Sequence, residues 1–262
     1  MILKFTSLSA YALRRSVKNL LLVMSLLIIV ISSGCDEDPP PIDTDPHALK
    51  LTLNHSWGSS DLALNDWYVT ANSDSFQLTK LIYHLNNVYL FNEAGDSMLV
   101  ADSWHMVNSE SKLNPTFDLG VFDESFSAIR FTIGVADSAV NASGMLNTLF
   151  TDPMYWGMAN GYINFKLEGK SPAVNDEGVI LHVGGYLEPY AAYAEVKVDF
   201  GTSILENKLG KNNLNLDVDL SEYFVNPDTI DLSTTNLIHT PGDAAVRISK
   251  NWPSMFSFTS ID

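Results

Sequence analysis

The sequence predicts an all-β protein: a single antiparallel β-sandwich of about eight or nine strands, with one or two short helices, one of them near the C-terminus. Three observations predict this class. Apolar and polar residues alternate with period two along many short segments, turn-forming residues separate those segments, and 46% of the residues are hydrophobic. No internal repeat divides the chain, so residues 47–262 are expected to form one folded domain.

The expected strands follow one another along the whole domain. They are residues 49–57, 76–91, 97–107, 126–135, 161–168, 179–184, 194–200 and 213–220. In the first strand the odd positions are apolar or aromatic, so His55 and Trp57 are expected to face the core. The second strand is expected to be interrupted at Asn86-Asn87. Residues 92–96 are typical of a hairpin turn because they combine Asn, Gly and Asp.

Two segments break the strand pattern and predict short helices. Residues 142–150 form the first of these. Residues 241–252 form the second, because their apolar residues recur at spacings of three and four and Pro253 ends the run.

The N-terminal segment predicts a bacterial lipoprotein signal peptide over residues 1–34. Basic residues precede an apolar stretch of about twelve residues, which is shorter than the roughly 20 needed to span a bilayer. Cys35, the only cysteine in the chain, follows Ser-Ser-Gly, and we expect cleavage before it and lipidation of its sulfur. An uncleaved anchor, or ordinary secretion with a free thiol, is the alternative.

Residues 35–46 are expected to tether the domain to the membrane through the lipid on Cys35. The segment is acidic and rich in proline, so it buries little apolar surface and stays extended. Acidic residues directly after the lipidated cysteine favour the outer membrane, with the domain facing the periplasm or the cell surface.

Charge and motif content exclude several classes of function. The formal net charge of −16 argues against nucleic-acid binding, which needs a basic surface. Phosphate-binding glycine loops, dinucleotide fingerprints, zinc-protease helices and serine nucleophile elbows are absent from the sequence. Glu168 with Asp152 or Glu177 could form an acid and base pair, but acidic surface residues are common. We therefore predict no catalytic residue and no enzymatic activity.

Histidines on expected strands are the candidate ligands. A buried imidazole such as that of His55 must be hydrogen-bonded or bind something, because an unpaired buried polar group costs about 1–3 kcal/mol. His182 lies on a strand that ends in Gly184 and Gly185, which permit close approach of a backbone or a ligand. Imidazole suits copper, zinc and other transition metals, although a single histidine is more often a satisfied core residue.

Several blocks of the sequence resemble the MbnP-like copper-binding protein family, here as a bacterial lipoprotein member. They are residues 51–55, 76–90, 131–135, 154–169 and 181–185. The block at 154–169, which begins Met-Tyr-Trp and ends Leu-Glu-Gly, is the most specific. The resemblance implies a β-sandwich without enzymatic turnover that binds or handles copper outside the cytoplasm. It also implies copper held by imidazoles and an oxidised tryptophan, kynurenine, made by a dihaem peroxidase-like partner protein.

Carried onto this chain, the resemblance implies His55 and His182 as metal ligands, with His239 as a weaker third. A shared site would require the rings of His55 and His182 to meet in the interior of the sandwich. Trp156 belongs to the most specific block and Trp57 lies two residues from His55, so these are the candidate modified or metal-adjacent tryptophans.

The sequence departs from the usual family pattern at three positions. His84 stands where the family has tyrosine, Asn86 where it has serine, and Met158 where it has a second tryptophan. The thioethers of Met154 and Met158 would favour Cu(I), although methionine is more often core filler.

A second hypothesis is a surface lipoprotein that binds glycans or a partner protein without metal. It rests on aromatic residues expected at the surface, where their faces can stack on sugars. They are Trp67, Tyr68, Trp104, Tyr190 and Tyr193.

Overall fold

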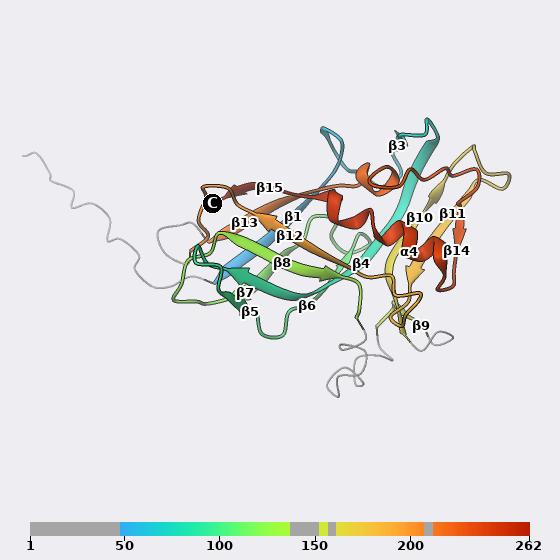
Figure 1. Ribbon diagram of the computed structural model, residues 1–262. Coiled ribbons are helices and arrows are strands. Elements are labelled where there is room, and N and C mark those ends of the chain that lie inside the picture. The colour runs from blue at the N-terminus through green and yellow to red at the C-terminus, as the bar shows by residue number, and fades with distance from the viewer. Residues whose placement is uncertain (1–47, 137–151, 157–160, 207–211) are drawn as a thin grey trace, which may run out of the picture. The chain divides into compact units, whose positions relative to one another are not determined.

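The computed structural model describes residues 48–136, 152–156, 161–206 and 212–262 (Figure 1). The expected signal peptide, the tether with Cys35 and the expected helix at residues 142–150 lie outside these ranges. Within them, no helix is long and apolar enough to cross a membrane.

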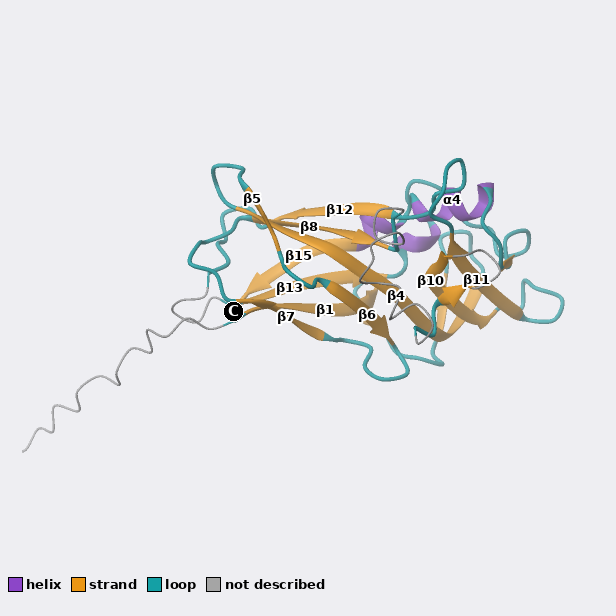
Figure 2. Cartoon of the chain, turned by 90° about the horizontal axis from the view of Figure 1, so that it is seen from below, coloured by secondary structure: helices purple, strands orange, loops and turns teal. Residues whose placement is uncertain are grey.

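The all-β class is confirmed, since the described part of the chain forms fifteen strands in two sheets, whose arrangement is drawn in Figure 1 and Figure 2. The small sheet has five strands: β15 (Phe256–Ile261), β13 (Asn213–Asp219), β1 (Leu49–Trp57) and β2 (Ser60–Asp61) in that order, with β7 (Thr116–Gly120) also on β1. The path of the ten-stranded large sheet is β12 (Ala194–Asp199), β8 (Ala128–Ile133), β4 (Ser75–Phe91), β10 (Gly161–Lys170), β11 (Gly178–Gly184) and β14 (Leu237–Ile238). Its remaining strands are β3 (Trp67–Val69), β5 (Ser97–Leu99) and β6 (Trp104–Asn108) on β4, and β9 (Tyr155–Trp156) on β10.

The main core lies between the two sheets, because alternate residues of each strand point inward. Along β4, Leu81, Tyr83 and Leu85 are completely buried in this core. Ile82 and His84 lie between them in sequence and therefore point to the opposite side of the large sheet, which we call the outer face. A second apolar cluster that includes Ile82 covers part of the outer face.

The helix expected near the C-terminus is confirmed as α4 (Asp243–Ser249), which buries Ala245 and Ile248 and packs against β11 (Figure 2). A 3-10 turn, η3 (Trp252–Met255), follows it and places Trp252 fully inside the core. The Trp252 ring stacks on Phe165 of β10 with centroids 5.2 Å apart. A second 3-10 turn, η2 (Glu222–Phe224), follows β13. These short elements close the core where the strands end.

Two strand pairs are parallel, which the sequence analysis did not anticipate: β1 with β13, and β11 with β14. Leu51 of β1 lies beside Leu214, and Leu53 beside Leu216. An alternating pattern is the same in both chain directions, so periodicity alone cannot assign the direction of a partner strand. The short strands β2, β3, β7, β9 and β14 and the terminal strand β15 were also not predicted.

The long strand β4 changes its partner along one edge. Its first half pairs with β10 and its second half with β8, while β3, β6 and β5 occupy the other edge. The interruption expected at Asn86-Asn87 is a bulge within a continuous strand, since the register shifts after Asn86 and Asn87 has a φ of 51°.

Two buried asparagines supply hydrogen bonds where β8 and β10 diverge from β4. The Asn86 Nδ2 donates to the Gly134 carbonyl oxygen at 2.6 Å, and the Val135 N–H donates to the Asn164 Oδ1 at 2.9 Å. The Asn164 Nδ2 in turn donates to the carbonyl oxygens of Ala192 and Gly185 at 2.8 and 3.2 Å. Side-chain amides therefore replace the strand-to-strand bonds that the divergence removes.

Gly134 packs closely against Asn164 at the place where β8 and β10 separate, so a substitution there tests this arrangement. Its φ is +90°, and an added Cβ would lie 2.6 Å from the Asn164 Cβ. We expect Gly134→Ala to lower the free energy of unfolding by about 3 kcal/mol or more, because it adds backbone strain and displaces a hydrogen-bonded amide. Urea unfolding followed by circular dichroism measures the loss.

Gly95→Ala is the matched control, because Gly95 has a φ of +88° and no atom within 4 Å of an added Cβ. It isolates the backbone strain, for which we expect about 1–2 kcal/mol. Equal losses in the two variants would contradict a special role for the packing of Asn164.

Candidate functional site

His55 lies on β1 in the main core and is 2% exposed. Its Nδ1–H donates to the Asn114 Oδ1 at 3.2 Å, because that oxygen can only accept. Its Nε2 then accepts the hydroxyl of Tyr83 at 3.0 Å, and burial raises the pKa of Tyr83, so the hydroxyl keeps its proton. Burial lowers the pKa of His55 to about 4. The imidazole is therefore neutral, and both of its nitrogens are hydrogen-bonded within the protein.

Trp57 is partly buried and belongs to an aromatic cluster packed against the main core. Its ring stacks on Tyr68 with centroids 4.7 Å apart and contacts Phe224 at 5.4 Å and Phe76 at 6.2 Å. These partners are distinct from those of His55, so the structure gives Trp57 a packing role.

His182 lies on the outer face of β11, since its neighbours Leu181 and Val183 are completely buried in the main core. Its Nε2 is 2.8 Å from the Glu168 Oε1. The carboxylate can only accept, so Nε2 carries the proton and Nδ1 of the neutral ring carries the lone pair. Burial lowers the pKa of His182, and the hydrogen bond to Glu168 only partly offsets this.

His239 follows the last residue of β14, near His182. Parallel pairing places Ile238 of β14 beside Leu181 of β11, and the paired register ends there, one residue before His182 and His239. A positive charge on His239 would lower the pKa of His182, so the two residues lie within electrostatic range of each other. His182 and His239 thus lie near the same edge of the large sheet.

The expected meeting of His55 and His182 in the interior is not found. His55 points into the main core, and His182 points away from it on the opposite side of the large sheet. In the strand at 178–184, Val179, Leu181 and Val183 form one wholly apolar set, whereas the set of His182 contains Ile180 and two glycines. The alternation itself therefore indicates that His182 faces away from the core.

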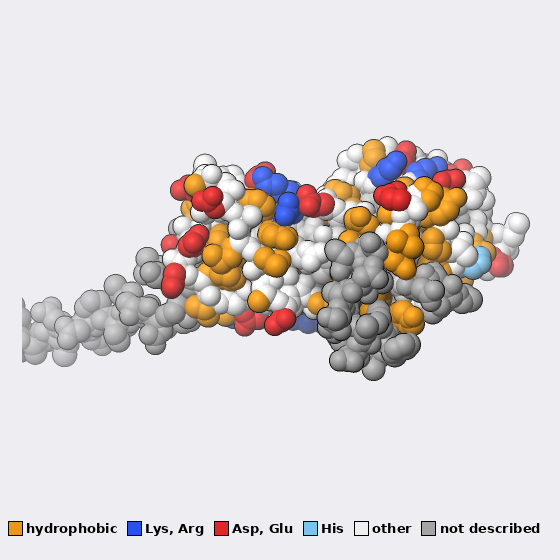
Figure 3. All heavy atoms as spheres, turned by 60° about the horizontal axis from the view of Figure 1, so that its bottom comes forward, with side chains coloured by type: hydrophobic (Ala, Val, Ile, Leu, Met, Phe, Trp, Pro, Cys, Tyr) orange, Lys and Arg blue, Asp and Glu red, His pale blue; other side chains and the backbone are white. Residues whose placement is uncertain are grey.

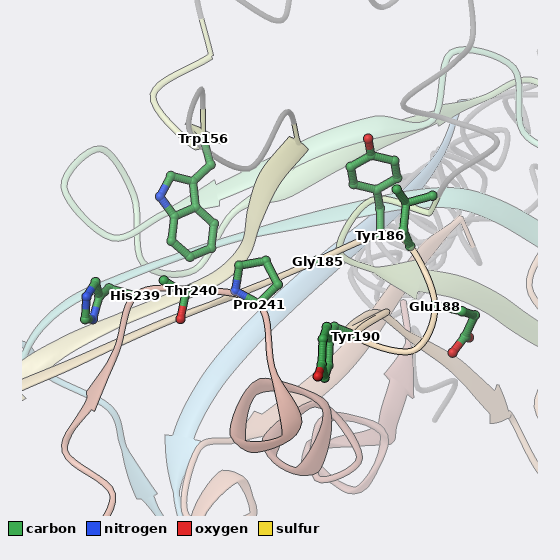
Figure 4. Close-up of a pocket in the computed structure, with 9 residues that line it drawn as sticks. Trp156, Gly185, Tyr186, Glu188, Tyr190, His239, Thr240 and Pro241 are labelled. Atoms are coloured by element: carbon green, nitrogen blue, oxygen red, sulfur yellow. The ribbon is translucent and has the colours of Figure 1, made fainter.

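Trp156 of β9 lines a pocket of about 320 Å³ that also includes His239 (Figure 4). Gly184 allows the indole to approach, because a Cβ at that position would lie 3.1 Å from the Trp156 Cζ3. The remaining lining residues are Gly185, Tyr186, Leu187, Glu188, Tyr190, Thr240 and Pro241. Of the three site residues that lie outside the core, Trp156 and His239 thus share a pocket, whereas His182 does not line it.

The aromatic residues expected at the surface divide into two groups. Trp67, Tyr190 and Tyr193 are exposed by 53%, 42% and 37%. Tyr68 packs on Trp57, and Trp104 packs on His84, so neither is free to bind a sugar face.

His84 has an environment that sequence reasoning missed. Its side chain is completely buried on the outer face, and its Nε2 is 2.8 Å from the Asp152 Oδ2. Burial would raise the pKa of Asp152, but the hydrogen bond and charge of His84 outweigh it and leave that pKa below its usual value. The Nδ1 of His84 is buried without a hydrogen-bond partner among the described residues. The replacement of the family's tyrosine by His84 was the only signal, since Asp152 lies 68 residues away.

Two of the acidic residues considered for catalysis are each hydrogen-bonded to a histidine. Glu168 binds His182, whereas Asp152 binds His84. Met154, one of the two candidate thioethers, is completely buried in the outer cluster with Ile82, and Met158 lies outside the described residues. No group of three or more His, Cys, Asp or Glu side chains able to hold a metal ion lies in the described ranges.

Comparison with known proteins identifies one family. The sequence model of the MbnP family matches residues 46–241, a span that contains all three candidate histidines. Among solved structures, the chain is similar to MbnP from Methylosinus trichosporium, with 12% sequence identity and a TM-score of 0.47 over 72% of this chain and 80% of that one. None of the curated proteins matches the sequence.

The depressed pKa of His55 predicts a specific pH dependence of stability. The folded-state pKa of about 4 lies below the ordinary value of 6.5, so the unfolded chain binds this proton first as the pH falls. The contribution of His55 is therefore complete above pH 6.5 and is lost between pH 6.5 and 4. Its full size is about 3 kcal/mol in the free energy of unfolding.

We expect the free energy of unfolding of the native chain to fall more steeply over this window than that of His55→Gln. Urea titrations from pH 7 to pH 4 measure both slopes, and all other titrating groups are common to the two proteins. Parallel slopes would contradict a neutral, buried His55.

Proposed function

The chain belongs to the MbnP family, and on this premise we propose that it is a copper-binding protein, without enzymatic turnover, that takes part in copper handling outside the cytoplasm. In this proposal His182 and His239 hold the metal. The observation that supports it is the parallel pairing of β14 with β11 at the edge of the large sheet, which leaves His239 within electrostatic range of His182.

The chemistry of this pair suits copper. Imidazole nitrogen is a ligand that copper accepts readily. The bond from Nε2–H of His182 to Glu168 orients the ring and leaves its Nδ1 as the donor, the arrangement in which a carboxylate supports a metal-binding histidine. The lowered pKa of His182 keeps its ring neutral near pH 7, so metal need not compete with a proton. His55 is not part of the proposed donor set, because both of its ring nitrogens are already hydrogen-bonded.

Long-range electrostatics favours a cationic ligand. The chain has a formal net charge of −16. Acidic side chains are scattered over the face drawn in Figure 3, whereas basic ones occupy only a few places on it. Such a field raises the local concentration of metal cations.

Trp156 is the proposed site of oxidation to kynurenine by a dihaem peroxidase-like partner. It lines the pocket that contains His239, whereas Trp57 is stacked among aromatic rings. The proposal further includes the lipid anchor on Cys35, the tether over residues 35–46 and placement at the outer membrane, facing the periplasm or the cell surface.

Titration of the purified full chain with Cu(I) against a chromophoric chelator tests the metal site. We expect about one equivalent to bind, and His182→Ala or His239→Ala to weaken binding at least tenfold because each removes a donor. Glu168→Gln should weaken it less, because it removes only the orienting carboxylate.

Ile180→Ala is the matched control, because Ile180 is an exposed residue of the outer face next to the site. It should bind copper as the native chain does. Native affinity in both histidine variants would refute the assignment of the donors.

The intact mass of the chain isolated from its own membranes tests the oxidised tryptophan. We expect a discrete mass gain that Trp156→Phe abolishes and Trp57→Phe retains, because only Trp156 lies at the pocket. An unmodified mass, or a gain that depends on Trp57, would contradict this part of the proposal.

A further inference from the structure

We propose that the pocket beside His239 binds a small organic cation, a compact ligand that carries an alkylammonium or quaternary ammonium group. This inference concerns a second ligand and does not depend on copper at His182 and His239. It rests on the walls of the pocket, its charge and the rigidity of the loop that forms one side.

Three segments distant in sequence form the walls. Trp156 comes from β9, Tyr190 from the connection between β11 and β12, and Pro241 from the segment that leads into α4. Figure 4 shows the rings of Trp156 and Tyr190 on either side of Pro241. The volume of about 320 Å³ is at the small end of the range for ligand pockets, which suits a single head group and not an extended chain.

The charge of the lining selects the sign of the ligand. Glu188 is the only carboxylate among the lining residues, and neither Lys nor Arg is present there. The faces of aromatic rings carry partial negative charge and attract cations. A carboxylate beside aromatic walls therefore attracts an organic cation and repels an anion.

The lining of the pocket is mostly apolar. Its polar side-chain groups are those of Glu188, His239 and Thr240, the two tyrosine hydroxyls and the Trp156 indole N–H. A sugar ring needs several hydrogen-bonding partners for its hydroxyls, whereas a quaternary ammonium needs none. The lining therefore favours the cation over the glycan considered from the sequence.

The loop that carries Tyr190 is already held in place without a ligand. The Tyr190 N–H donates to the Leu187 carbonyl oxygen at 3.0 Å, and the Ala192 N–H donates to the Gly185 carbonyl oxygen at 3.0 Å. The buried Asn164 Nδ2 donates to the same Gly185 oxygen at 3.2 Å. Binding therefore does not have to order this wall, which reduces its entropic cost.

Choline and its neutral isostere 3,3-dimethylbutan-1-ol test the proposal, since they have the same shape and differ in charge. Both are titrated into the metal-free full chain, with an added chelator, and followed by tryptophan fluorescence and ligand-observed NMR. We expect choline to saturate the site and the alcohol to bind at least tenfold more weakly. Equal binding of the two, or binding of glucose in place of choline, would overturn the proposal.

Variants locate the binding. Tyr190→Leu and Trp156→Leu should each weaken choline binding about tenfold, and Glu188→Gln about threefold or more. Tyr193→Leu is the matched control, because Tyr193 is similarly exposed but lies outside the lining, and it should bind choline normally. Unchanged urea midpoints verify that the variants are folded. Equal effects of Tyr190→Leu and Tyr193→Leu would place binding elsewhere and overturn the assignment.

His182→Ala separates this inference from the proposed function. His182 does not line the pocket, so choline binding should persist in a variant whose copper binding is weakened. Loss of both ligands in this variant would show that the pocket is not an independent site and would overturn the proposal.

Discussion

The architecture depends on the change of partner along one edge of β4. The same edge of β4 pairs first with β10 and then with β8, and these two strands separate between the two paired stretches. Backbone groups left there without hydrogen-bond partners would destabilise a buried sheet. Asn86 and Asn164 supply the missing hydrogen bonds, and Gly134 leaves the space that Asn164 occupies. The large sheet can therefore continue from β12 to β14 as one layer over the core.

The side-chain amide of Asn164 also connects the core to the candidate site. Asn164 binds Val135 through its oxygen and the carbonyls of Gly185 and Ala192 through its nitrogen. Gly185 and Ala192 flank the loop that carries Tyr190. The Asn164 amide, which supplies hydrogen bonds where β8 and β10 separate, therefore also positions one wall of the pocket. Fold stability and site geometry thus depend in part on one buried side chain.

The histidines that point into the main core and those on the outer face of the large sheet differ in which ring nitrogens are hydrogen-bonded. On the core side, His55 is neutral and bonded at both nitrogens, which satisfies a buried polar group but leaves no donor for a metal. On the outer face, His182 and His84 each have a carboxylate on Nε2, so their remaining nitrogen is the one available. His182 also lies within electrostatic range of a second imidazole, that of His239, which is why the proposed metal site is at the sheet edge and not in the core.

Local periodicity was enough to determine the all-β class, the first strand at residues 49–57, the hairpin turn at residues 92–96 and the helix before Pro253, because each depends on residues close in sequence. The order and spacing of the blocks that resemble the family were likewise enough to place the chain in it. Only the tertiary structure decided that β13 runs parallel to β1, because alternation is unchanged by reversing a strand. The outward position of His182 agrees with the apolar set Val179, Leu181 and Val183, and it was the family resemblance that led us to expect this ring in the interior with His55. The pairing of His84 with Asp152 and the pocket formed by Trp156, Tyr190 and His239 also required the folded chain, since packing brings together residues whose separation carries no local signal.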